Sequence, residues 1–122
     1  MKHGLDALRI RVQRDVESYV YTVPEGALGN PLPTDRVQTL MDELKAALVE
    51  PYMTSVALRD AFDQCAVDPP TTVQYAIVAD DGVNVVFYDD TADEFGLAQR
   101  GSSGGIETIG VRGDVVGVFM AR

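Results

Sequence analysis

The chain contains no tryptophan, one cysteine and one histidine among its 122 residues. The single Cys65 excludes an internal disulfide, and this composition is not that of a cross-linked secreted scaffold. Nucleophilic catalysis also finds little support, because His3 lies near a chain end and Ser102 and Ser103 have no evident base beside them. We therefore predict no catalytic residues and no cofactor, and we expect a non-enzymatic protein.

Long apolar runs are also missing from the sequence. No segment approaches the 18 or so apolar residues of a membrane helix, and residues 1–15 contain no continuous apolar stretch of the kind found in signal peptides. We expect a cytoplasmic protein without a membrane partner. At this length, residues 1–122 are predicted to form a single domain.

Basic residues are absent from residues 72–99, although the chain as a whole has ten lysines and arginines. The same segment carries six carboxylates, and the net charge of the chain is −9. This distribution argues against nucleic acid as a partner, because nucleic acid binding needs a basic face. It favours a basic protein partner, whose approach an acidic surface accelerates.

Two β-prone runs joined by Asp80-Asp81-Gly82 predict a hairpin over residues 73–88. A two-residue loop would pair Asp80 with Val83, whereas a three-residue loop pairs Ala79 with Val83. We favour the second register, because it separates apolar from mixed residues more cleanly. One face then contains Val73, Tyr75, Ile77, Ala79, Val83, Val85 and Phe87, and we expect it to pack on helices. The mixed face contains Gln74, Ala76, Val78, Asn84, Val86 and Tyr88.

Helices are predicted in the first half of the chain, about residues 5–68. Residues 5–21 fit either a short strand or an amphipathic helix, and the longer periodicity favours a helix over about 5–20. A regular apolar stripe predicts a helix over about 35–50 that Pro51 ends. A third helix is predicted from about Thr54 or Ser55 to Cys65.

Strands are predicted in the second half, about residues 71–122. Residues 95–99 fit a short strand or a helical turn, residues 100–105 form a flexible loop, and residues 106–111 and 115–121 read as a second hairpin across Arg112-Gly113. The predicted fold class is α+β. Its N-terminal helices pack on one face of a four- or five-stranded antiparallel meander sheet.

The leading hypothesis is a small acidic interaction domain, of the kind that inhibits or escorts a basic protein partner. Its predicted partner-binding residues are the six carboxylates of the acidic segment: Asp80, Asp81, Asp89, Asp90, Asp93 and Glu94. The hairpin places Asp80 and Asp81 at one end of the sheet and the other four at the opposite end. We predict no metal site, because an EF-hand pattern starting at Asp89 has Glu94 where glycine is needed.

Two alternatives remain open at this stage. The first is a ligand-binding or enzymatic domain with a pocket between sheet and helices near residues 99–105. Its ligand-binding residues would be Tyr75, Tyr88, Arg100, Ser102 and Ser103. The second is a homo-oligomer formed through exposed sheet edges or through the mixed sheet face.

Overall fold

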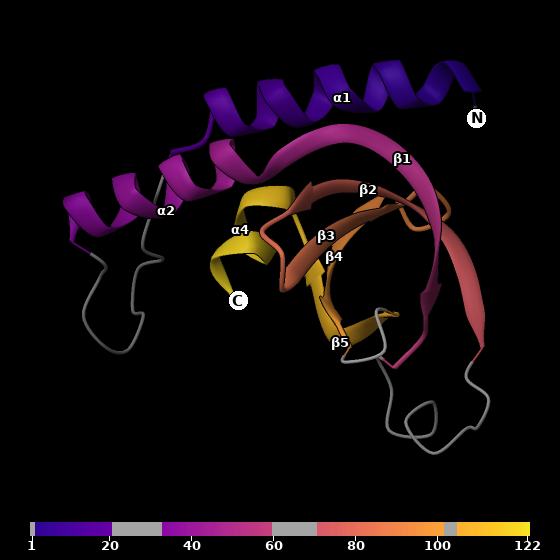
Figure 1. The fold of residues 1–122 in the computed structure, drawn as a ribbon. Helices are drawn as coiled ribbons and strands as arrows, with labels where there is room; N and C mark the ends of the chain where they lie inside the picture. Colours follow the sequence, from indigo (N-terminus) through magenta and orange to yellow (C-terminus); the bar gives the residue numbers. More distant parts are fainter. Residues whose placement is uncertain (1, 21–32, 60–70, 102–104) are drawn as a thin grey trace.

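The computed structural model describes residues 2–20, 33–59, 71–101 and 105–122 (Figure 1). The described residues form three helices and five strands. In chain order these are α1 (Lys2–Glu17), α2 (Thr34–Ala47), β1 (Leu48–Ala57), β2 (Thr72–Asp80), β3 (Asn84–Asp89), β4 (Glu94–Arg100), β5 (Ile106–Gly113) and α4 (Val115–Met120). The predicted α+β class, with helices packed on a five-stranded antiparallel meander, is confirmed.

The five strands form a closed barrel in the order β1-β2-β3-β4-β5. Consecutive strands are antiparallel, so the first and the fifth run in the same direction. The barrel therefore closes through a parallel contact, in which Ala57 of β1 pairs with Glu107 of β5. The sequence did not predict this closure.

Closure gives the sheet two buried faces, each with its own core. The barrel interior holds Val56, Tyr75, Ile77, Val85, Phe87, Ala98 and Ile106. The outer face packs against α1, α2 and α4 through residues that include Leu8, Val12, Leu44, Val78, Val86, Phe95 and Phe119. In Figure 1, α1 runs above β1, and α4 lies below α2, where it contacts both other helices and strands β3, β4 and β5.

The hairpin face predicted from alternation is largely correct, but its direction is wrong. Val73, Tyr75, Ile77, Val85 and Phe87 do share one core, whereas Ala79, predicted on the same face, lies in the outer core beyond the register shift. That core is the barrel interior, whereas the mixed face, with Ala76, Val78 and Val86, packs against the helices. An open sheet with helices on one side has one deeply buried face, whereas closure of the barrel adds a buried interior to the face that the helices cover.

The predicted pairing of Ala79 with Val83 is also wrong. Asp80 pairs with Val85 and Ala79 with Val86, and a register shift lies between Ile77 and Ala79. Val83 is 60% exposed at the hairpin tip. The wider loop is stabilised by Asp81, whose Oδ1 accepts hydrogen bonds from the backbone N–H groups of Val83 (2.9 Å) and Asn84 (2.7 Å).

Helix α1 confirms the helical interpretation of the first segment, and α2 confirms the second helix. However, α2 ends at Ala47, before Pro51, and Leu48 already has extended backbone angles (φ −61°, ψ 135°). Strand β1 continues through Pro51, at a bulge between Leu48 and Tyr52. The predicted third helix is therefore wrong as far as Ala57, and the rest of that prediction lies outside the described residues.

The segment after Arg112 is a helix, so the predicted second hairpin is wrong. Strand β5 ends at Gly113, and Asp114 caps α4 by accepting a hydrogen bond at Oδ2 from the Gly117 N–H (2.9 Å). Four side chains of α4 are buried in the outer core: Val115, Val116, Val118 and Phe119. Its short apolar run fits a buried strand as well as a buried helix, because periodicity does not distinguish the two in so short a segment. Residues 95–99 belong to β4, which decides the other open alternative in favour of a strand.

Candidate functional site: the two ends of the barrel

The acidic segment forms two clusters, because β3 separates the hairpin from the bend at residues 90–93. We call the first the hairpin cluster; it consists of Glu43, Asp80, Asp81, Arg100 and Arg122. We call the second the bend cluster; it consists of Arg11, Asp89, Asp90, Asp93, Glu94 and Arg112. Each cluster combines predicted carboxylates with arginines that come from distant parts of the chain.

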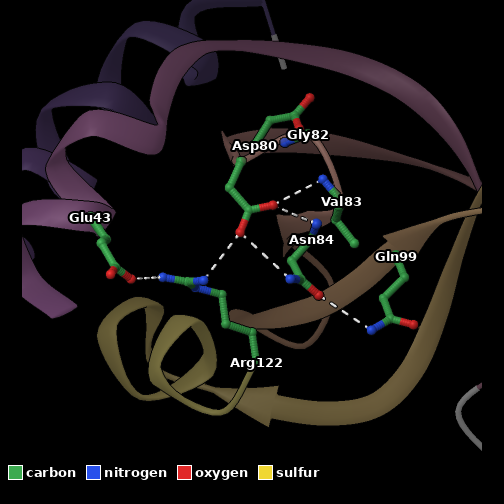
Figure 2. A network of polar contacts seen from close by, with 8 residues as sticks. Glu43, Asp80, Gly82, Val83, Asn84, Gln99 and Arg122 are labelled. Atoms are coloured by element: carbon green, nitrogen blue, oxygen red, sulfur yellow. Dashed lines mark hydrogen bonds and ion pairs between the residues drawn. The ribbon is translucent and has the colours of Figure 1, made fainter.

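In the hairpin cluster, both predicted carboxylates are ion-paired. Arg100 of β4 pairs with Asp80, and Arg122, beyond α4, pairs with Asp81 (Nη1 to Oδ2, 3.3 Å) and with Glu43 of α2. Figure 2 shows Arg122 joining α2 to the hairpin tip. The cluster thus connects α2, the β2–β3 hairpin, β4 and the residue Arg122 that follows α4.

The electrostatics of the hairpin cluster favour ionised carboxylates. The hydrogen bond from Arg100 lowers the pKa of Asp80 below its ordinary value. Burial alone would raise the pKa of Asp81, but the backbone hydrogen bonds from Asn84 and Val83 outweigh burial and lower it. A hollow of about 480 Å³ lies beside these groups, lined by Glu43, Ala46, Ala47, Asp80, Asp81 and Arg122.

The inner part of the bend cluster closes one end of the barrel. Arg112 of β5 donates from Nη1 to Asp89 Oδ2 (2.8 Å) and to Glu94 Oε1 (3.5 Å). Its guanidinium carbon lies 5.2 Å from the ring centroid of Phe87, which stacks on Tyr75 at 4.6 Å. The Tyr75 hydroxyl donates to Asp89 Oδ2 (3.4 Å). Arg112 therefore neutralises the half-buried Asp89 directly above the barrel core.

The outer part of the bend cluster attaches α1 to the barrel. Arg11 donates from Nη1 to Asp93 Oδ1 (2.6 Å) and to the Tyr88 hydroxyl (3.3 Å), and that hydroxyl donates to Asp93 Oδ1 (2.7 Å). These hydrogen bonds, first the one from Arg11, lower the pKa of Asp93. The same contact with Asp93 raises the pKa of Tyr88. Asp93 itself has a positive φ of 52°, as the tight bend requires.

The outermost carboxylates of the bend cluster reach the surface. Asp90 is exposed and makes no ion pair within the described part of the chain. The side chain of Asp93 is 68% exposed and that of Glu94 37%. Asp90 and Tyr88 line a hollow of about 230 Å³, whose other lining residues are Gly4, Ala7, Leu8 and Arg11. The bend thus places an unpaired carboxylate beside a partly apolar hollow.

The residues of the ligand-binding alternative do not converge. Tyr75 lies inside the barrel, and Tyr88 lies on the outer face at the bend. Arg100 pairs with Asp80 at the other end of β3, while Ser102 and Ser103 lie outside the described residues. A hollow of about 260 Å³ does lie between α1 and the β1 bulge, where Arg9 faces Glu50 at 3.7 Å, but Tyr75, Tyr88 and Arg100 are not among its lining residues. Another hollow, of about 350 Å³, lies between α1 and α2 beside Leu48, and none of the described residues of the ligand-binding alternative lines it.

Within the residues that the structure describes, no group of three or more His, Cys, Asp or Glu side chains is placed to hold a metal ion. None of the described helices has the length and apolar character needed to cross a membrane.

Comparisons with known proteins found nothing similar: no protein-family model matches the chain, and neither a curated protein nor a solved structure does.

Sequence reasoning found the carboxylates but missed the cations that pair with them. Arg11 and Arg122 come from opposite ends of the chain, and Arg112 was assigned to a turn. The sequence signal for them is the absence of lysine and arginine from residues 72–99, because half-buried carboxylates then need cationic partners from other parts of the chain.

Proposed function

We propose that the protein is a non-enzymatic interaction domain that binds a basic protein partner through the bend cluster. The observation that carries the proposal is the exposed Asp90 beside the hollow formed with α1. The acidic composition of the whole chain, at −9, supports it by favouring the approach of a positively charged surface.

The bend cluster is the better of the two acidic ends for this role. It has four carboxylates (Asp89, Asp90, Asp93, Glu94) against two arginines (Arg11, Arg112), so its net charge is −2. The hairpin cluster has three carboxylates (Glu43, Asp80, Asp81) against two arginines (Arg100, Arg122), so its net charge is −1. The bend cluster also keeps one carboxylate without an internal ion pair among the described residues, whereas each carboxylate of the hairpin cluster has an arginine.

The hollow beside Asp90 suits a lysine or arginine side chain of the partner. Such side chains bury an apolar stem and keep the charged head in water. Leu8, Ala7 and the Tyr88 ring offer apolar surface for the stem, and Asp90 offers a carboxylate for the head. Contacts of this kind at an exposed site add about 0.2–1 kcal/mol each, so specificity requires several of them together.

Peptide binding tests the proposal. A fluorescent lysine-rich peptide is titrated with the wild-type protein and with Asp90→Asn and Glu94→Gln, at low and at high salt. We expect each substitution to weaken binding by about 2- to 5-fold, and binding to weaken further as salt increases.

The matched control is Asp42→Asn, which makes the same charge change on the exposed surface of α2. An effect of Asp42→Asn as large as that of Asp90→Asn would show that binding follows net charge alone. That result, or an absence of peptide binding at low salt, would contradict the proposal.

A further inference from the structure

The outer edge of β1 is an unpaired stretch of backbone in the described part of the chain. On one edge, β1 pairs with β2 from Leu48 to Ala57. On the other edge, its pairing with β5 is limited to Ala57 with Glu107. Before that contact, residues 52–56 have no neighbouring strand there among the described residues, and Pro51 and the bulge mark where the regular strand begins.

The open stretch is apolar and uncharged in an otherwise acidic chain. Residues 51–58, with the sequence PYMTSVAL, contain no Asp, Glu, Lys or Arg. Tyr52 is 40% exposed and Met53 is 41% exposed. Edge strands in soluble proteins are commonly protected by charges or prolines, because their free N–H and C=O groups recruit another strand. Beyond Pro51, this edge carries no such protection.

We propose that this edge pairs with the same edge of a second copy of the chain, antiparallel and centred on Thr54. In that register Thr54 faces Thr54 of the second copy, and the exposed Met53 faces the exposed Ser55. Threonine pairs are favourable across antiparallel strands. The flanking charges have opposite signs, since Glu50 precedes the segment and Arg59 follows it, and antiparallel pairing brings the two ends together.

A second copy fits this edge better than the basic partner does. The segment has no charge with which to recognise a basic surface, but it is complementary to itself. The mixed sheet face, the other surface considered for self-association, is covered by helices at Ala76, Val78 and Val86. Pairing along five residues is a small contact, so we expect a weak dimer that forms at high protein concentration.

Salt dependence separates this association from the proposed partner binding. Two copies with a charge of −9 each repel one another, and salt screens that repulsion. Self-association therefore strengthens as salt increases, whereas binding of a basic peptide weakens. Either result can fail without the other, since the bend cluster and the β1 edge share no residue.

Sedimentation velocity over a wide concentration range is the first test, with the wild-type protein, Thr54→Lys and Val83→Lys. Thr54→Lys places like charges opposite each other in the pair, and we expect it to weaken the dimer by about 10-fold or more. Val83→Lys makes the same charge gain at the exposed hairpin tip and should leave the dimer as strong as in wild type or slightly stronger.

Cysteine crosslinking is the second test and remains informative if Thr54→Lys fails to fold. Residues that face each other across antiparallel strands have Cα atoms about 4.5–5.5 Å apart, within the range of a disulfide. We expect oxidised Thr54→Cys to form a dimer joined through its introduced thiols, identified by peptide mass mapping, much faster than Val83→Cys. A monomer at every concentration and salt level, or equal crosslinking of the two variants, would overturn the proposal.

Discussion

Replacing Gly96 with alanine should destabilise the barrel through a single steric conflict. Gly96 of β4 lies directly opposite Phe87 of β3. A Cβ atom at Gly96 would lie 2.2 Å from Cζ of the Phe87 ring and 2.6 Å from Cε1. The ring has little room to move, because Phe87 is fully buried, stacks on Tyr75 and lies beneath Arg112. The glycine is therefore required by the shape of the barrel core.

The size of the effect follows from the two ways in which the core can respond. Overpacking that is relieved by small shifts costs about 1–3 kcal/mol, whereas losing the packing of a buried phenylalanine costs about 3–5 kcal/mol. We expect Gly96→Ala to lower the free energy of unfolding by about 2–4 kcal/mol, measured by urea denaturation followed by circular dichroism.

A double-mutant cycle identifies the cause. Phe87→Leu removes the ring atoms that the new methyl group would meet, so the combination of Gly96→Ala with Phe87→Leu should be destabilised by less than the sum of the two single changes. A loss below about 0.5 kcal/mol for Gly96→Ala, or simple additivity in the cycle, would refute the packing argument.

Three further predictions concern the polar contacts. Arg112→Ala should lower the free energy of unfolding by about 1–3 kcal/mol, because it leaves the half-buried Asp89 without its cation, whereas Arg9→Ala removes an exposed ion pair and should lower it by less than about 0.5 kcal/mol. Chemical denaturation measures both variants, and equal losses would contradict the role assigned to Arg112. Asp114→Ala should lower the free energy of unfolding by about 0.5–2 kcal/mol by removing the cap of α4, whereas Asp114→Asn, which keeps a capping oxygen, should lose much less. An unchanged free energy of unfolding for Asp114→Ala in the same assay would show that the cap is not needed. Asp80, Asp81 and Asp89 have lowered pKa values in the folded protein, so their contribution to stability is present above about pH 4 and is lost as the pH falls through the folded values. Thermal melts from pH 7 to pH 2.5 should show a melting temperature that decreases once the pH is below about 4. A melting temperature that rises on acidification would contradict these contacts.

The fold class could be predicted because alternation and helical periodicity are local properties. The shared face of Tyr75, Ile77, Val85 and Phe87 followed from alternation alone. Whether that face meets helices or the inside of a barrel depends on closure between β1 and β5, about 50 residues apart in the sequence, which no local pattern encodes.

Two local errors have local causes. The short apolar run Val115–Met120 fits both a buried strand and a buried helix, and the cap at Asp114 was the signal in favour of the helix. Pro51 in the sequence favours the end of a helix, although proline also occurs at bulges in edge strands, as it does in β1. For the candidate site, the sequence shows the six carboxylates within residues 80–94, but the arginines that pair with them are brought there only by the tertiary fold.

The proposed role of the bend cluster is tested most directly by mapping where a basic ligand binds. A ¹⁵N-labelled protein is titrated with the lysine-rich peptide at low salt, and backbone amide shifts are followed by NMR. The account predicts that the largest shifts fall on the bend at residues 88–94 and on the facing turns of α1 around Ala7 and Leu8, and that Asp90→Asn reduces them. Shifts concentrated on the hairpin cluster or spread evenly over the acidic surface would contradict it.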